Sequence, residues 1–200
     1  MPPFTPWSPL PLFEVGRLLG GGFRWWVAGG YAIELAVGRV VRPHGDVDVL
    51  LLRRDQLAAQ QALDGWELWA ADPPGRLRPW VQGEVLGSDV HDIWCRPGPG
   101  APWRLQLMLD ESSESGAEWM SRRDSSVRRA VASLGAVSPD GLPYLRPEVQ
   151  LYYKAGDPRP KDELDFAAAL AVLDGVQRGW LAEAITRTYG EHPWHARLRP

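Results

Sequence analysis

The most constraining feature of the sequence is a pair of apolar runs separated by a Gly-Gly turn. The first run, residues 23–28, stops at Gly29-Gly30, and a helix-like segment follows over residues 31–37. The second run, residues 47–52, is apolar on both faces, as is typical of a central buried strand. This order predicts a strand, a tight glycine turn, a short helix and a second strand. The rest of the chain has to pack around that unit.

Two acidic residues open the second apolar run. Asp46 and Asp48 alternate with Val47, and alternate side chains of a strand point to the same face. We therefore expect two carboxylates roughly 6–7 Å apart that repel one another. An isolated Asp-x-Asp also occurs as a turn or a cap, but the buried strand and the glycine turn favour a cation site. Hard carboxylate oxygens suit Mg²⁺.

A third carboxylate stands at the end of another alternating segment. Residues 91–96 and 104–110 both alternate, with a Pro/Gly turn between them, which predicts a hairpin that ends at Asp110. If that strand lies beside residues 47–52, Asp110 converges with the acidic pair. Three carboxylates suit one or two Mg²⁺ ions, which keep some water and bind substrate phosphates.

Several other residues are candidates for binding phosphate. The turn at Gly29-Gly30 can present backbone N–H groups and a helix N-terminus, although it lacks the P-loop and dinucleotide-binding patterns. Arg42 and His44 approach the acidic pair along the chain, and His44 has no partner histidine at zinc-ligand spacing. Lys154 and Lys161 flank a break between two late helices, where they are either phosphate contacts or solvated helix ends.

Composition excludes several classes of protein. A net charge of −3 argues against a general nucleic-acid coat, and no apolar run is long enough for a transmembrane helix. The single cysteine, Cys95, allows no intrachain disulfide and fits a reducing compartment, and the N-terminus does not resemble a signal peptide. We therefore expect a cytoplasmic protein. Eleven tryptophans are unusual, and they either fill a core or line a cleft that stacks ring-shaped ligands.

The predicted elements place a mixed sheet first and helices last. This pattern predicts an α+β fold with a core over residues 1–146 and a helical segment over residues 147–200 packed on it. Residues 1–9 are expected to form an irregular Pro-rich arm. The further predicted helices cover residues 10–19, 54–63, 147–154, 161–173 and 180–189, and the further strands cover residues 66–70 and 84–90.

One block of residues resembles a known family. It comprises Gly29-Gly30-Tyr31-Ala32-Ile33-Glu34, Gly38-Arg39, Arg42 and His44-Gly45-Asp46-Val47-Asp48. It resembles the aminoglycoside 2''-nucleotidyltransferase-like group of the DNA polymerase beta-type nucleotidyltransferase superfamily. The similarity extends less specifically to residues 105–110 and 147–166. The resemblance implies a small mixed sheet flanked by helices, with a C-terminal helical part.

The resemblance also implies an activity. Such enzymes move a nucleoside monophosphate from a nucleoside triphosphate, such as ATP, to a hydroxyl group. It implies that Asp46 and Asp48 hold Mg²⁺, with two ions expected, and that a third acid completes the site. Asp110 is the candidate by position, and Asp92 and Glu111 are alternatives.

The other implied roles concern phosphate and the acceptor. Gly29-Gly30 and the following helix would cradle the triphosphate, while Arg42, His44, Lys154 and Lys161 would neutralise its charge. The acceptor is expected to be a hydroxylated small molecule, with an aminoglycoside-like antibiotic as one candidate. Two alternatives stay open. The first is a toxin-type enzyme that modifies RNA or protein and has an antitoxin partner, and the second is a non-catalytic nucleotide-binding module.

Overall fold

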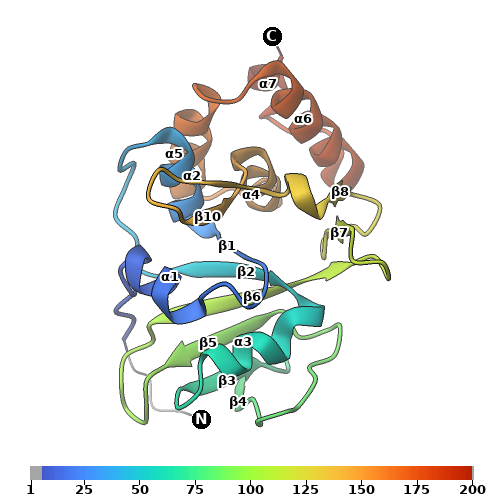
Figure 1. Cartoon of the computed structure of the whole chain (residues 1–200). Helices are drawn as coiled ribbons and strands as arrows, with labels where there is room; N and C mark the ends of the chain where they lie inside the picture. Colours follow the sequence, from blue (N-terminus) through green and yellow to red (C-terminus); the bar gives the residue numbers. More distant parts are fainter. Residues whose placement is uncertain (1–5, 200) are drawn as a thin grey trace.

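A computed structural model describes residues 6–199 of the chain, and its central feature is a mixed β-sheet with helices on both faces (Figure 1). The strands are β1 Trp25–Val27, β2 Asp48–Leu52, β3 Glu67–Ala71, β4 Leu77–Pro79, β5 Asp92–Arg96, β6 Leu105–Ser112, β7 Glu118–Met120, β8 Arg128–Ala130, β9 Gly135–Val137 and β10 Pro143–Leu145. The α-helices are α1 Leu12–Leu19, α2 Gly29–Val37, α3 Gln56–Ala62, α4 Pro147–Lys154, α5 Pro160–Leu170, α6 Gly175–Tyr189 and α7 His195–Leu198. Short 3-10 turns occupy Arg53–Asp55 and Val131–Ser133. The predicted α+β class is confirmed.

The strand order places β2 at the centre of the sheet. The order is β4-β3-β5-β6-β2-β1-β10-β9, with β7 on the far end of β6 and β8 paired to β7. β2 pairs antiparallel with β1 and parallel with β6. The predicted hairpin of β5 and β6 is present as an antiparallel pair. Because β2 is bonded on both sides and apolar on both faces, it is the rigid element on which the site is built.

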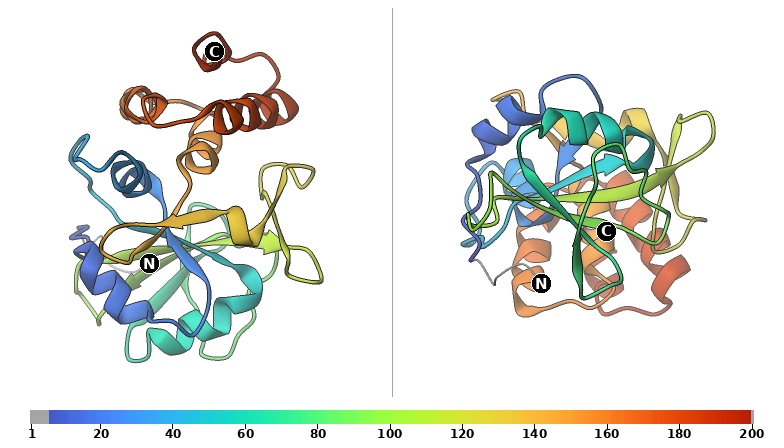
Figure 2. Two further views of the ribbon diagram at one scale, coloured as in Figure 1. Left: turned by 45° about the horizontal axis from the view of Figure 1, so that its top comes forward. Right: turned by 90° about the horizontal axis from the view of Figure 1, so that it is seen from below.

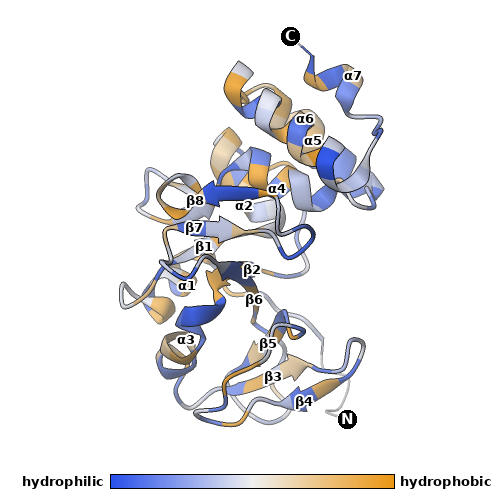
Figure 3. Cartoon of the chain, turned by 90° about the vertical axis from the view of Figure 1, so that its right-hand side faces the viewer, coloured by the Kyte–Doolittle hydropathy of each residue, from blue (hydrophilic) through white to orange (hydrophobic). Residues whose placement is uncertain are grey.

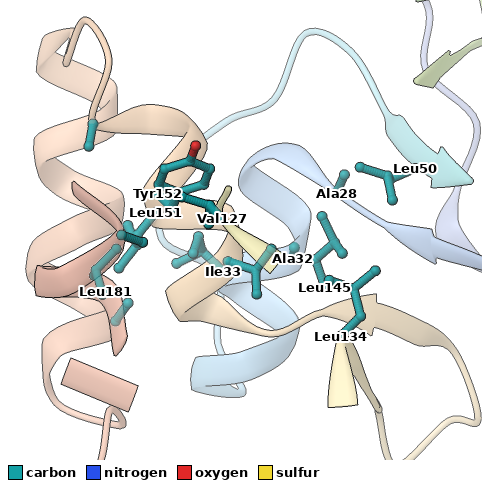
Figure 4. Packing of buried hydrophobic residues seen from close by; sticks show 14 of the residues in the cluster. Ala28, Ala32, Ile33, Leu50, Val127, Leu134, Leu145, Leu151, Tyr152 and Leu181 are labelled. Carbon is teal, nitrogen blue, oxygen red and sulfur yellow. The ribbon is translucent and has the colours of Figure 1, made fainter. Parts of the chain in front are cut away.

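Each face of the sheet has its own apolar core. Alternate residues of the central strands, such as Val49 and Leu51, pack under α1 and α3. The opposite face, with Leu50 and Leu52, packs against α2, α4 and the later helices. Figure 2 shows the sheet edge-on between these two groups of helices. Figure 4 shows how Leu50 and Ala28 meet Ile33 and Leu145 in the second core.

The C-terminal helices combine hydrophobic and hydrophilic positions along each helix (Figure 3). Helix α4 starts at Pro147, as the sequence predicts, because proline suits the first helical position. Its buried Glu148 receives a hydrogen bond from Arg129 at 2.7 Å and one from Gln177 at 2.8 Å. Among the described residues, no helix is long and apolar enough to cross a membrane.

Most predicted elements are present, with shifted ends. The helix predicted after the glycine turn begins earlier, at Gly29 itself, so the turn is its first residues. The strand predicted over residues 84–90 is wrong. The side chain of Gln56 accepts the Leu86 N–H at 2.7 Å, which satisfies a backbone donor that would otherwise need a partner strand. Residues 1–5 of the predicted arm lie outside the described residues.

Candidate active site

Asp48 and Gly29 meet where β2 begins and β1 ends. The Ala28 N–H donates to the Asp48 carbonyl at 2.8 Å, which holds the two chain segments together. Gly29 has φ of 64°, a left-handed conformation that favours glycine. A Cβ atom at Gly29 would collide with the Asp48 carboxylate. Glycine is therefore required here both for the backbone and for the approach of the acid.

The Asp48 carboxylate is in a costly electrostatic environment. Burial and then the neighbouring charge of Asp46 raise its pKa to about 7, although Lys154 and Lys161 oppose the rise. Asp46 itself lies two residues before the strand, because β2 starts at Asp48. The structure thus brings the two predicted acids close together, with Asp46 on the approach to the strand rather than within it.

The structure does not bring Asp110 to this pair. β2 and β6 are neighbours, but they run parallel, with Asp48 opposite Gln106 and Leu52 opposite Asp110. Asp110 is therefore four residues further along, roughly 13 Å away at the rise of a strand. It is fully buried and accepts hydrogen bonds from Trp119 Nε1 at 2.6 Å and from the Tyr153 hydroxyl. The prediction that Asp110 converges with Asp46 and Asp48 is therefore wrong, because this register separates Asp110 from the pair.

Asp92 is the acid that the fold places near Asp48. It lies on β5 opposite Met108, and its Oδ1 accepts a hydrogen bond from Gln106 Nε2 at 3.1 Å. Its charge contributes to the raised pKa of Asp48. Of the two alternatives named from the sequence, Glu111 is excluded by position, because it pairs with Arg53 beyond Asp110.

Arg122 contacts both Asp92 and Asp110, the carboxylates that the sequence offered as candidates for the third acid of the site. Its guanidinium lies 3.4 Å from Asp92 Oδ1 and 3.7 Å from Asp110 Oδ1, and its side chain is largely buried. Burial raises the pKa of Asp110, while Arg122 and the Tyr153 hydroxyl counteract the rise. Asp110 therefore orients Arg122 beside Asp92 rather than facing Asp48.

Lys154 is held at the site by two buried acids from α5. Its Nζ lies 2.7 Å from Asp162 Oδ1 and 3.0 Å from Asp165 Oδ2. Arg42 makes a two-pronged contact with Asp165, with both distances 2.9 Å. The pair therefore ties the loop before β2 to α5. Lys161 lies on the same helix and stabilises the charged form of Asp48 only through space.

His44 and Gly30 support this loop from the other side. His44 Nε2 lies 2.9 Å from Glu34 Oε1, and its ring lies 4.1 Å from that of Tyr31. A Cβ atom at Gly30 would collide with Arg42 and His44, so glycine permits their close approach. Both side chains that were expected to contact phosphate are thus engaged within the protein.

A cleft of about 460 Å³ opens between the sheet and the C-terminal helices. Gln150 borders it and accepts the Gly29 N–H at 2.8 Å, so that donor is not free for a phosphate. The first hydrogen bond within α2 is from Ala32, which leaves the N–H groups of Gly30 and Tyr31 without an intrahelical acceptor. The lining residues are Gly29, Asp48, Met108, Arg122, Arg123, Gln150, Tyr153, Lys154, Gly156, Asp157, Arg159, Asp162 and Tyr189.

The donor set beside the cleft fits Mg²⁺. Over residues 6–199, no three side chains of the usual ligand types already form a closed metal cage. Mg²⁺ rarely needs one, because it binds through one or two carboxylates and takes water and substrate phosphates as its other ligands. Asp46 and Asp48 supply such a pair, and burial together with the charge of Asp46 raises the pKa of Asp48, so a bound cation would stabilise its charged form.

Comparison with known proteins shows which family the chain resembles. Residues 14–72 match the family model described as aminoglycoside-2''-adenylyltransferase. Curated 2''-aminoglycoside nucleotidyltransferases of Escherichia coli and Klebsiella pneumoniae are each 27% identical over 143 residues, which covers 56% of this chain and 78% of theirs. Over these residues the chain is similar to the aminoglycoside 2''-nucleotidyltransferases. Together with the fold, this similarity indicates that the protein is a nucleotidyltransferase.

Solved structures show the same fold. The crystal structure of ANT(2'')-Ia in complex with adenylyl-2''-tobramycin has a TM-score of 0.52 at 13% identity and covers 88% of this chain and 94% of that chain. The lincomycin-bound lincosamide adenylyltransferase LnuA has a TM-score of 0.51 at 14% identity and covers 81% and 94%. At these identities the likeness shows the fold that this nucleotidyltransferase family shares.

Three residues that line the cleft were missed from the sequence, namely Gln150, Tyr153 and Arg122. Gln150 lies on α4, three residues before Tyr153 and four residues before Lys154, which was predicted. That spacing puts side chains on one face of a helix. A glutamine on the same face as Lys154 was a usable signal, whereas Arg122 lies in a loop that has no periodic pattern.

Proposed function

We propose that this chain transfers a nucleoside monophosphate from a nucleoside triphosphate to a hydroxyl group of a small molecule, with Mg²⁺ bound at Asp46 and Asp48. The observation that carries the proposal is the contact of the Asp48 carboxylate with Gly29 at the mouth of a cleft that also contains Lys154. The contact places an unbalanced negative charge next to a helix N-terminus and a fixed cation. A metal–triphosphate complex needs such a combination.

In the proposed reaction the acceptor oxygen attacks the α-phosphorus. A bond forms between these two atoms, the bond from the α-phosphorus to the bridging oxygen breaks, and pyrophosphate leaves. Bound Mg²⁺ would neutralise the phosphate charge and favour the ionised acceptor oxygen. We assign the acceptance of the hydroxyl proton to Asp92, in place of Asp110, because the charge of Asp92 acts on Asp48 and its carboxylate is held beside Gln106, the residue opposite Asp48.

Fixed cations support the triphosphate. Lys154 is positioned by Asp162 and Asp165, which reduces the side-chain entropy that is lost when a phosphate reaches it. Arg122 and Arg159 line the same cleft. Arg42 and His44 contribute by holding the loop that carries Asp46, and Lys161 adds long-range positive charge. In this proposal residues 1–146 form the catalytic core, and residues 147–200 close the nucleotide side of the cleft.

Relatives suggest the class of acceptor. The curated relatives are named for aminoglycosides, and the structural neighbours for tobramycin and lincomycin. A hydroxylated antibiotic is therefore the first class of acceptor to test.

The test is mass spectrometry of an acceptor panel incubated with ATP, GTP, CTP or UTP and Mg²⁺. A mass gain of one nucleoside monophosphate on a small molecule is expected, with none when the metal is chelated. Asp46→Ala should abolish the gain while the fold is retained, whereas the exposed Asp64→Ala serves as a matched control. If Asp46→Ala transferred nucleotide at the wild-type rate, the assignment of Asp46 as a Mg²⁺ ligand would be wrong. A gain on RNA or protein alone would favour the toxin-type alternative.

A further inference from the structure

A row of four side chains crosses the sheet in register and starts at Asp48. Asp48 lies opposite Gln106, Gln106 opposite Trp94, and Trp94 opposite Trp69. Residues directly opposite one another on neighbouring strands point to the same face. At a strand spacing of about 4.8 Å, the Trp94 backbone is roughly 10 Å from Asp48 and that of Trp69 roughly 14 Å.

Within residues 6–199, the rings of this row have few aromatic and cationic neighbours: Trp7 and Trp103 lie against Trp94, and the Arg96 guanidinium lies 5.9 Å from the Trp69 ring centroid. On the opposite face, Leu68, Ile93 and Leu107 of the same strands are buried under α1 and α3. In the row itself, Trp69 and Trp94 are only partly buried. Trp7 and Trp103 contact Trp94 nearly perpendicularly, at centroid distances of 5.1 and 5.5 Å, which fixes the indole. Large aromatic side chains that are partly exposed beside a reaction centre are candidates for ligand contact.

Charges beside the row are already balanced. Glu67 receives a 2.6 Å hydrogen bond from Arg96, whose guanidinium lies 4.6 Å from the Trp103 ring. Asp92 is paired with Arg122 at 3.4 Å. The exposed acids Glu114, in the β6–β7 loop, and Glu118, at the start of β7, lie beyond Asp110 and away from the row. The surface past Asp48 is therefore aromatic and amide in character rather than acidic.

We propose that Trp94, Trp69 and Gln106 form the acceptor shelf of this enzyme, and that the acceptor is a neutral or weakly charged hydroxylated compound with an apolar ring face, such as a glycoside, rather than a polycation. The inference rests on the proposed transfer reaction for its orientation. One hydroxyl reaches the Asp48 end of the row while a ring about 10 Å away stacks on Trp94. The nucleotide occupies the cleft on the other side of Asp48. Gln106, whose amide Nε2 donates to Asp92 Oδ1, lies between the two.

The test uses the indole N–H signals of the ¹⁵N-labelled full chain in NMR spectra without nucleotide. They are assigned by single Trp→Phe variants. The probes are 4-nitrophenyl β-D-glucoside, which is neutral and has two ring faces, and tobramycin, which is a polycation. The glucoside should shift the Trp69 and Trp94 signals. It should leave those of Trp66, which packs against the opposite core, and of Trp180 on α6 unchanged.

Trp94→Ala should weaken glucoside binding about 3- to 10-fold, the usual worth of one aromatic stack, and Trp94→Phe should recover most of it. Trp66→Ala is the matched control and should bind as the wild type does. The shelf is overturned if the glucoside shifts neither row signal, or shifts all four alike. The charge assignment is overturned if tobramycin shifts Trp94 as strongly as the glucoside does.

Enzyme kinetics separate this inference from the proposed function. With an acceptor that is modified, Trp94→Ala should raise the acceptor KM and leave the KM for the nucleoside triphosphate unchanged. Unchanged acceptor KM values would overturn the shelf while the transferase stands. Glucoside binding at Trp94 without any nucleotide transfer would overturn the proposed function and leave the shelf as a ring-binding site.

Discussion

At the residue scale, the close approach of Asp48 to Gly29 can be tested separately from the backbone strain that follows when a glycine at positive φ is replaced. Gly29 and Gly38 have nearly equal positive φ values, 64° and 70°, but only a Cβ atom at Gly29 would meet Asp48. Both Ala variants should lose about 1 kcal/mol of stability from the backbone. Only Gly29→Ala should also lose nucleotide transfer, by at least about 100-fold, because it displaces the carboxylate. Thermal unfolding and kcat measurements on the two variants check this. Equal activities would show that the contact with Asp48 has no catalytic consequence.

A second residue-scale prediction separates Asp92 from Asp110. Asp92→Asn should reduce kcat by about 100-fold or more, because it removes the proposed proton acceptor, whose charge acts on Asp48. Asp110→Asn should keep kcat within about 10-fold of the wild type. It should still destabilise the fold by about 1–3 kcal/mol, because Trp119 and Tyr153 donate to that buried carboxylate. Steady-state kinetics and urea unfolding measure both effects. A folded Asp110→Asn variant as inactive as Asp92→Asn would restore Asp110 as the catalytic acid.

At the scale of elements, α4 and α5 are joined by an ion pair that depends on pH. Burial opposes ionisation of Asp162, but hydrogen bonds from Arg159 and Lys154 outweigh it and lower the pKa to about 2. A carboxyl with a depressed pKa stabilises the fold above its ordinary value of 3.8, and this contribution is lost as the pH falls toward 2.

In the Asp162→Asn variant, the free energy of unfolding should therefore depend less on pH in the acid range than it does in the wild type. Between pH 5 and pH 2 the wild type should lose about 2 kcal/mol more than the variant, as followed by urea unfolding at each pH. Asp157→Asn, an exposed change in the adjacent loop, should follow the wild-type curve. A parallel loss in the wild type and in Asp162→Asn would show that the Lys154 pair adds no net stability.

At the scale of the whole molecule, the two faces of the sheet differ. The face under α1 and α3 is a closed core, whereas Asp48 divides the other face. On one side of Asp48 the C-terminal helices form a charged cleft, and on the other side lie the partly buried Trp94 and Trp69 of the proposed acceptor shelf. The two reactants can then approach Asp48 from opposite directions. The division follows from β2 being central, since an edge strand would have only one neighbouring surface.

The sequence alone determined the strand–turn–helix–strand unit over residues 23–52 and the family that the chain resembles. Apolar runs on both sides of a glycine pair dictate strand, turn and helix, because these patterns act over a few residues. The acidic pair and the helix beginning at Pro147 are local in the same sense. The tertiary structure alone decided which other side chains join the pair. That choice depends on the parallel register of β2 and β6, which moves Asp110 four residues away, and on the pairing of β5, which brings Asp92 and Trp94 into reach. Register is set by the packing of whole faces between distant segments, so no local pattern records it.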